Sequence, residues 1–395
     1  MKALLLGASC ALSLMAAPVA AKGPEPVYTW TRMAWNFTSA TERAAFDAAG
    51  VFARAPLAGV EADRNGNIYV TTPRWLDAKV PSTLSKVLMV GGKPLLEPFP
   101  SWQAHNLSDP STIRNALGVF VDDKNRMWIV DMGFIAGEDS VPEGAQKLIG
   151  IDLSTGSEIA RYAIPDEIAN RATSFLNDLV VDTENEVIYI TDSGNRGGTP
   201  VPAGIIIYDI ASNSARRVLD RDRSVTDDPN LWLKVDGEEV FEGNRLAVGI
   251  NGIALSPDHQ TLFWSVTTAD ALYSAPVSVL RDKTADAAKV SAAVSKPLRI
   301  GGGSDGIAFD PTGRLWITNL ALNRLEVLEP GSEDTKVLVE GPDFLWPDSL
   351  ATDFNGGMLL TTNHLNHAFG GKMSYDGDAP NFRIWRLPAD MSTAR

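Results

Sequence analysis

The stretch "SDGIAFDPTGRLWITN", from Ser304 to Asn319, joins a short apolar strand, an Asp-Pro-Thr-Gly turn and a second strand rich in Trp and Ile. A turn of this composition between two apolar runs predicts a β-hairpin. Other stretches repeat the pattern of apolar strand, Asp or Ser, Gly- or Asn-containing turn and aromatic strand; they begin at Gly59, Gly118, Asn177, Asn251 and Asp348. Six hairpins of one kind predict a repeat architecture.

The spacing of these hairpins indicates the fold class. The polar residue before each turn aligns the six copies, at Asp63, Asp122, Asp182, Ser256, Asp310 and Asp353. The intervals of roughly 40 to 75 residues suit one four-stranded blade plus its loops. We therefore predict an all-β fold, a six-bladed β-propeller with four-stranded antiparallel blades around a central channel.

The remaining segments fit this architecture. The N-terminal "VYTWTRMAWNF" reads as a strand, and we expect it to close the ring by joining the last blade near Phe382 to Leu387. Helical periodicity is confined to Thr41–Ala49 and Val277–Ala293. In the longest insertion, the apolar triplet Leu231–Leu233 is a candidate cap for a cavity. Residues 22–395 are thus predicted to form one propeller domain.

Residues 1–21 are typical of a secretory signal peptide. Lys2 provides the basic start, an apolar run follows, and small residues end it. We expect a periplasmic or secreted protein whose mature chain begins near Lys22. The single cysteine, Cys10, lies in this segment, so the mature chain is expected to fold without disulfides. We expect a monomer with no membrane partner once the signal is removed, because no other apolar run is long enough to span a bilayer.

The charge balance limits the partners. The chain has 35 Lys and Arg against 49 Asp and Glu, a formal net charge of −14. Binding to nucleic acid requires a basic surface, so nucleic acid is not an expected partner. A negative field favours metal ions or amines instead. The expected partner is a small molecule.

One column of positions indicates a site. Inner strands line the axis of a propeller, so equivalent positions of the six copies meet around the channel. Five residues before the aligned polar residue lie Ala58, Leu117, Asn177, Asn251, Asp305 and Asp348. Most copies have glycine at the next position, which would let backbone and ligand approach closely. Asp178 replaces that glycine in the third copy, and strand alternation predicts that its side chain points away from Asn177.

Oxygen donors without His or Cys suit a hard divalent cation, Ca²⁺ or Mg²⁺. We predict a metal site formed by Asn177, Asn251, Asp305 and Asp348. A cation there can polarise a carbonyl or activate water, which makes Asp305 and Asp348 the candidate catalytic residues. In the alternatives, the carboxylates hold an ammonium group or act as a general base. Asn and Asp also serve at strand starts without any function, because their side chains bond nearby backbone.

A second candidate metal motif is "HLNH", from His364 to His367. Zinc sites need three or four close ligands. The other histidines, His105 and His259, are far away in the sequence, so we expect a loop at the channel mouth and leave the role of this motif open.

Four motifs resemble the major royal jelly protein and Yellow family: "VTTPRW" from Val70, "VPSTL" from Val80, "FLWPDSL" from Phe344 and "LLTTNHL" from Leu359. The family is one of six-bladed propellers. Its members include insect proteins that bind aromatic amines in the channel and proteins associated with dopachrome conversion. The resemblance implies that Asp348 and Asn363 contact a ligand.

More distantly, "NGIALSPDHQTLFW" from Asn251 and the opening stretch are similar to blades of gluconolactonase and regucalcin-like lactonases. In those enzymes a Glu, an Asn and an Asp hold a divalent cation, with a further Asn nearby. The resemblance implies these roles for Asn251, Asp305 and Asn177. The Glu has no counterpart, because Ala58 occupies its register and Glu61 lies three residues on. We expect Asp348 to replace it.

The leading hypothesis is thus an exported, metal-dependent, lactonase-like hydrolase of a lactone or similar carbonyl ester. The first alternative is a non-catalytic binding protein for an amine or aromatic metabolite, with Asn177, Asn251, Asp348 and Asn363 as its candidate ligand contacts. A dopachrome-type tautomerase and a purely structural propeller are the remaining alternatives.

Overall fold

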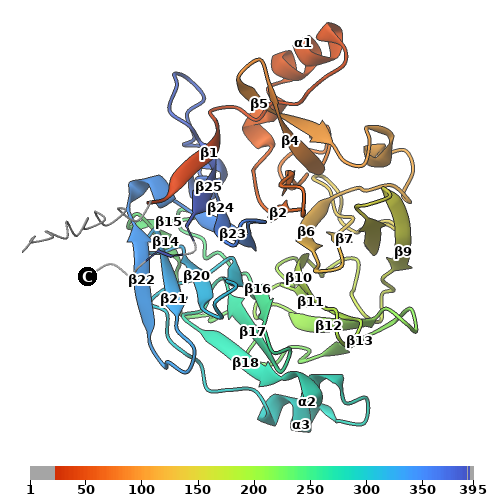
Figure 1. Cartoon of the computed structure of the whole chain (residues 1–395), viewed down its shortest axis with the longest axis vertical. Coiled ribbons are helices and arrows are strands. Elements are labelled where there is room, and N and C mark those ends of the chain that lie inside the picture. Colours follow the sequence, from red (N-terminus) through yellow and green to blue (C-terminus); the bar gives the residue numbers. More distant parts are fainter. Residues whose placement is uncertain (1–22, 389, 392–395) are drawn as a thin grey trace, which may run out of the picture.

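A computed structural model describes residues 23–388 and 390–391. Its strands form six antiparallel sheets arranged around one axis (Figure 1). The predicted six-bladed β-propeller is confirmed. The predicted signal peptide, residues 1–21, lies outside the described residues.

The six predicted hairpins supply the two inner strands of every blade. Apolar and β-branched residues dominate both strands, because each sheet is covered on both faces by its neighbours. The innermost strands are β2 (Val60–Ala62), β6 (Ala116–Val121), β10 (Leu176–Asp182), β16 (Ile250–Leu255), β19 (Ile307–Phe309) and β23 (Pro347–Thr352). The second strands are β3 (Ile68–Thr71), β7 (Arg126–Asp131), β11 (Val187–Asp192), β17 (Thr261–Val266), β20 (Leu315–Asn319) and β24 (Met358–Thr362).

The aligned residue of each hairpin, Asp in five copies and Ser256 in the fourth, lies at the turn. In the opening stretch, Asp310 Oδ1 accepts hydrogen bonds from the backbone N–H groups of Thr312 and Arg314, at 2.9 and 3.0 Å. Its Oδ2 accepts the Trp316 indole N–H at 2.8 Å and pairs with the Arg314 guanidinium. One carboxylate thus satisfies the turn and anchors the following strand.

Two further strands complete most blades. The third strands are β4 (Leu84–Val90), β8 (Lys147–Asp152), β12 (Gly204–Asp209), β18 (Leu272–Pro276), β21 (Arg324–Leu328) and β25 (Phe382–Leu387). The outer strands are β5 (Lys93–Pro98), β9 (Ser157–Ala163), β13 (Ser214–Val218), β22 (Thr335–Glu340) and β1 (Glu25–Trp30).

The fourth blade differs from the prediction of four strands. It contains β16, β17 and β18 only, and Leu298 forms an isolated bridge to Leu272 at its outer edge. The predicted helix over Val277–Ala293 is two short helices, α2 (Val277–Arg281) and α3 (Ala287–Ala292), which follow β18 at the outer side of the ring (Figure 1). Val277, Leu280 and Val290 are buried against the blade, so the helices cover apolar surface there.

The N-terminal strand closes the ring as predicted. β1 pairs antiparallel with β25, with Trp30 opposite Phe382, and forms the outer strand of the last blade (Figure 1). The buried Trp30 indole also donates a hydrogen bond to the Pro94 carbonyl of β5, at 2.8 Å. The N-terminal strand therefore completes the last blade by backbone pairing, and the Trp30 side chain joins that blade to the first.

Glycines set the approach of neighbouring blades. A Cβ atom on Gly118, Gly252 or Gly306 would lie 2.5, 2.5 or 2.3 Å from the backbone oxygen that starts the next inner strand. These distances are too short for any side chain, so glycine is required for blade contact. The repeated glycine was expected to admit a ligand; Gly59, Gly118 and Gly306 line the channel cavity, and the missing side chain also lets the next blade pack against them.

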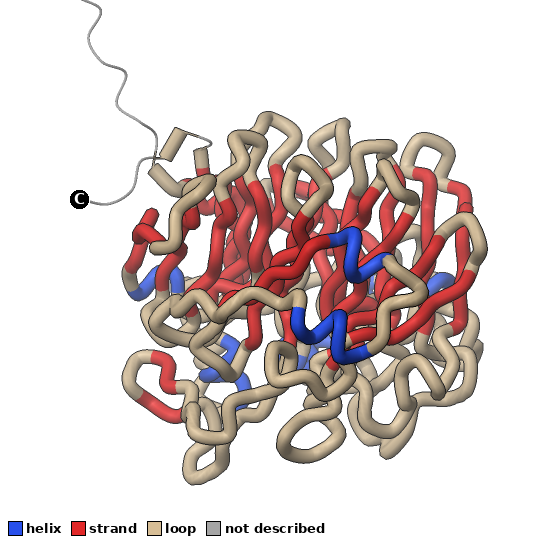
Figure 2. The backbone as a smooth tube through the Cα atoms, turned by 90° about the horizontal axis from the view of Figure 1, so that it is seen from below, coloured by secondary structure: helices blue, strands red, loops and turns tan. Residues whose placement is uncertain are grey.

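Longer connections gather on one face of the strands (Figure 2). They include the hairpin of β14 (Lys234–Val235) and β15 (Glu238–Glu239), the short helix α4 (Leu365–Phe369), and three 3₁₀ turns, η1 (Val51–Arg54), η2 (Gln103–His105) and η3 (Pro342–Phe344). Helix α1 (Ala40–Ala49) matches the predicted Thr41–Ala49 and begins at Ser39, whose hydroxyl caps it. Among residues 23–388 and 390–391, no helix has the length and apolar character needed to cross a membrane.

Candidate functional site

The channel widens into a cavity of about 760 Å³ at the face that carries β14 and β15. The inner strands of all six blades contribute to its wall. The predicted site residues Asn177, Asn251, Asp305 and Asp348 all line this one cavity. The structure thus places the column of polar strand starts around a single space.

Asp305 is the most firmly held of these residues. Its Oδ1 accepts hydrogen bonds from Asn251 Nδ2 at 2.8 Å and Thr267 Oγ1 at 3.2 Å. Its Oδ2 accepts the Trp346 indole N–H at 2.7 Å. Trp346 has a φ of 49°, in the left-handed region that bulky residues rarely adopt. Backbone strain of this kind is concentrated at functional sites.

Asp348 begins β23 beside Asp305. Its Oδ2 accepts a hydrogen bond from Asn363 Nδ2 at 2.6 Å, and its Oδ1 accepts one from the Ser349 hydroxyl at 3.1 Å. Asn363 is 0% exposed, donates to the Leu57 carbonyl at 2.7 Å and accepts from the Leu365 N–H. Asn363 therefore orients Asp348 from behind, whereas the sequence resemblance implied a direct ligand contact.

Asn177 and Asp178 both line the cavity, although they are adjacent in β10. The pairing of β10 with β11 shifts register between Leu176 and Leu179, which breaks the alternation of side chains. This irregularity explains why Asp178 does not point away from the cavity as predicted. Its Oδ1 accepts from the Leu179 N–H at 2.8 Å, and its Oδ2 accepts from the Ile253 N–H at 3.4 Å.

Glu61 is a fourth channel carboxyl group that the sequence analysis did not include in the site. It lies in the middle of β2, is 7% exposed and lines the same cavity. The signal available in the sequence was one acidic residue within the apolar segment "GVEA". Its place three residues beyond the column of strand starts kept it out of the predicted site.

Burial raises the pKa of all four channel carboxyl groups. The pKa of Asp178 rises to about 7 and that of Asp348 to about 6. Burial also holds the pKa values of Glu61 and Asp305 well above the usual range. Like-charge repulsion from Asp178 raises the pKa of Glu61 further, and repulsion from Asp348 does the same for Asp305. Part of this acidic set is therefore protonated near neutral pH.

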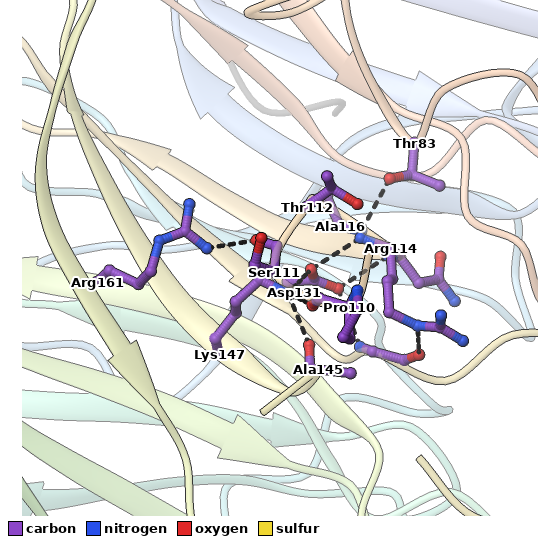
Figure 3. Close-up of polar contacts among 12 residues, drawn as sticks. Thr83, Pro110, Ser111, Thr112, Arg114, Ala116, Asp131, Ala145, Lys147 and Arg161 are labelled. Carbon is purple, nitrogen blue, oxygen red and sulfur yellow. Dashed lines mark hydrogen bonds and ion pairs between the residues drawn. The ribbon is translucent and has the colours of Figure 1, made fainter. Parts of the chain in front are cut away.

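Most buried carboxylates elsewhere in the protein have cationic partners; Asp63 is an exception, held by the backbone N–H groups of its turn and by the side chains of Asn67 and Tyr69. Asp131 accepts the Lys147 ammonium at 2.8 Å and the backbone N–H of Arg114 at 2.8 Å (Figure 3). Asp192 likewise pairs with Arg217 at 2.8 Å. Within the part of the chain that the structure describes, no cationic side chain pairs with the channel carboxyl groups Glu61, Asp178, Asp305 and Asp348. The channel thus differs from the rest of the interior in gathering several carboxyl groups of raised pKa, without a cationic partner, around one cavity.

Apolar side chains cover the cavity mouth. Trp346 packs in one cluster with Leu233 of the long insertion and Leu365 of α4. The rings of Phe241 and Phe369, from the same two segments, lie 5.2 Å apart at the cavity wall. Of the apolar triplet that was a candidate cap, Leu233 is buried in this cluster and Trp232 is 45% exposed. Phe241, from the same insertion, lines the cavity itself.

The mouth also contains Arg245, which belongs to the cavity wall but pairs with the buried Asp227. The positive charge of Arg245 is therefore already compensated by Asp227.

Of the two histidines of the H-x-x-H motif, His364 precedes α4 and His367 lies within it. The rings of His364 and His367 are 5.8 Å apart, and burial lowers the pKa of His364 to about 4. Among residues 23–388 and 390–391, no three His, Cys, Asp or Glu side chains are grouped so as to hold a metal ion. The motif thus belongs to the short helix α4 and the loop before it, at the channel mouth.

The fold and the site together define a class: six-bladed β-propellers with an acidic channel under an apolar cover. Residues 115–394 match the family model of the major royal jelly proteins. The chain belongs to the major royal jelly protein family.

Relatives within this family are moderately similar. Major royal jelly protein 3 of Apis mellifera is 31% identical over 257 residues, which cover 62% of this chain and 44% of that protein. Major royal jelly protein 2 of Apis mellifera is 29% identical over 257 residues, covering 62% of this chain and 53% of that protein. The chain thus matches about half of the length of these relatives.

A solved structure assigned to the gluconolactonases superposes with a TM-score of 0.50. The superposition covers 86% of this chain and 91% of that one, at 13% sequence identity. At this identity the likeness concerns the fold alone.

Proposed function

We propose that the channel binds a small organic cation, an amine with an apolar or aromatic body. The observation that carries this proposal is the set of channel carboxyl groups without a cationic partner, Glu61, Asp178, Asp305 and Asp348. Burial of an ionised carboxylate is unfavourable unless an opposite charge accompanies it. A ligand ammonium group would supply that charge.

The cavity has the shape and wall expected for such a ligand. About 760 Å³ is the size of a small-molecule site. Its outer part presents aromatic rings of Trp75, Phe175, Phe241 and Phe369. These rings suit an apolar body, and their faces attract cations. Aromatic-amine binding by members of the Yellow family, expected from the sequence motifs, agrees with this chemistry.

The second candidate is the hydrolase of the sequence analysis, in which Ca²⁺ or Mg²⁺ promotes attack of water on a lactone. One observation favours it. Asn177 and Asn251 direct their Nδ2 atoms to the hydroxyls of Ser193 and Thr267, which leaves their amide oxygens for the channel beside Asp305. Amide and carboxylate oxygens are the donors that these cations prefer. The cation would activate water, with Asp305 or Asp348 accepting the proton.

Isothermal titration calorimetry with phenethylamine tests the first candidate. The informative variant is Asp348→Asn, because the hydroxyl of Ser349 can turn to donate or accept and the amide therefore keeps the local hydrogen bonds. The matched control is Asp47→Asn, on the exposed side of α1. We expect the wild type and the control to bind, and the channel variant to lose affinity by about tenfold or more.

The same titration separates the candidates. Amine binding that persists in excess EDTA supports the amine-binding protein. Binding of Ca²⁺, together with turnover of a lactone panel that EDTA abolishes and Asp305→Ala removes, would support the hydrolase. Absence of phenethylamine binding by the wild type would contradict the first proposal.

A further inference from the structure

We propose that the channel accepts elongated dications, the class of linear diamines, whose second ammonium group is held at Glu61. The inference rests on the proposed function, because the first ammonium group occupies the end of the channel at Asp305 and Asp348. It adds a second subsite deeper along the axis.

The register of the inner strands places Glu61 deeper in the channel than Asp305 and Asp348. Glu61 lies two residues before the turn aspartate of its blade, whereas Asp305 and Asp348 lie five residues before theirs. Three strand residues correspond to about 10 Å. The two acidic positions are thus separated along the channel by a distance that one ammonium group cannot span.

The carboxyl group of Glu61 is held by backbone groups of Val121 and Ala62, and its surroundings offer it no opposite charge. The other blades place apolar residues at the same level, namely Phe120, Val180, Ala254, Ala308 and Ala351, and all of them line the cavity. The alanines leave space in the channel, which here is bordered by small side chains. A carboxyl group that is 7% exposed and lies in an apolar ring has no structural counter-charge among the described residues. A ligand cation would provide it, with its methylene chain against the ring.

Asp178 connects the two levels. It lies one residue deeper in the channel than Asn177, and its Oδ2 accepts a hydrogen bond from the Ile253 N–H of the neighbouring inner strand, at 3.4 Å. The acidic groups therefore follow the channel from the mouth to Glu61 without a gap longer than a few strand residues.

The space continues beyond Glu61. A second cavity of about 440 Å³ opens on the opposite face, and it shares wall residues with the first, including Phe120, Val121, Val180 and Leu255. An extended chain can therefore enter from the mouth and lie along the axis. A compact monoamine would fill only the outer part.

Titration calorimetry with octanediamine and octylamine tests the inference, because the two molecules differ in the second ammonium group and little else. We expect the diamine to bind the wild-type protein about tenfold or more tightly than the monoamine. In Glu61→Gln this advantage is expected to fall to less than about threefold, because the diamine loses the partner of its second ammonium group. Glu42→Gln, on the exposed helix α1, is the matched control and should retain the full advantage.

The outcomes distinguish the inference from the proposed function. Equal affinities for diamine and monoamine in the wild type, or an advantage that survives Glu61→Gln, would overturn the second subsite and leave amine binding intact. Failure of both amines to bind would overturn the proposed function as well. Octylamine binding by Glu61→Gln reports that the variant is folded, so loss of both ligands in this variant alone would count against the specific role of Glu61.

Discussion

The same residue type has two roles five positions apart in the opening stretch. Asp310 forms a turn, where backbone N–H groups and the Arg314 guanidinium stabilise its charge. Asp305 lies at the channel, where neutral donors hold its oxygens and burial raises its pKa. The difference comes from position in the blade: Asp310 lies at the hairpin turn, whereas Asp305 lies at the start of the innermost strand, beside the channel.

The raised pKa of Asp178, about 7, predicts how stability depends on pH. The folded state keeps the proton over the range in which the unfolded chain, with an ordinary aspartate pKa, has lost it. The free protein therefore loses stability as pH rises from about 4 to about 7. We expect Asp178→Asn to remove part of this loss and to raise the free energy of unfolding at pH 8 by on the order of 1 kcal/mol or more.

Urea unfolding of the wild type and Asp178→Asn at about pH 5.5 and pH 8 measures this effect. The difference between the two proteins should grow with pH. A variant that is equally destabilised at both pH values would show that Asp178 has a structural role and an ordinary pKa.

At the scale of elements, the contact between blades depends on glycine. Gly306 lies where a Cβ would be 2.3 Å from the Asp348 carbonyl oxygen, so Gly306→Ala must displace the start of β23. We expect a loss of about 1–3 kcal/mol in the free energy of unfolding. Because β23 carries Asp348, amine affinity is expected to fall as well.

Thermal unfolding followed by calorimetry measures the effect of Gly306→Ala. Gly23→Ala is the control, since a Cβ there meets nothing within 4 Å. A melting temperature for Gly306→Ala equal to that of the control would show that the blades are not in the close contact described.

The sequence was informative about elements whose signals are local. Asp and Gly at fixed offsets indicate hairpin turns, so the inner strands could be predicted from stretches such as Ser304–Asn319. The register shift before Leu179 was not, because it depends on how β10 pairs with β11. Local periodicity predicted helical structure in the segment of α2 and α3, but the absence of a fourth strand from that blade could not be predicted, because it depends on the packing of these helices against the blade.

At the scale of the whole molecule, ring closure brings distant residues into one channel. β1 seals the last blade by pairing with β25, and the inner strands then surround a common axis (Figure 1). The column of Asn177, Asn251, Asp305 and Asp348 could be predicted, because a propeller converts equal register into spatial proximity. Glu61 was left out of the predicted site because it lies at a different register. Asn363 was predicted as a ligand contact, and its role behind Asp348 depends on packing that the sequence does not reveal.

The central claim is that the channel is lined by buried carboxyl groups whose negative charge a cationic ligand compensates. A cation lowers the pKa values of nearby carboxyl groups, so binding must release protons wherever those groups were protonated. The pKa of Asp348, about 6, and that of Asp178, about 7, place this release near neutral pH.

The most direct measurement is the number of protons released when phenethylamine binds at about pH 6.5, obtained by calorimetry in two buffers of different ionisation enthalpy. We expect the wild type to release a measurable fraction of a proton, and Asp348→Asn to release less and to bind more weakly. Amine binding without any proton release, or release that is unchanged in Asp348→Asn, would contradict the account.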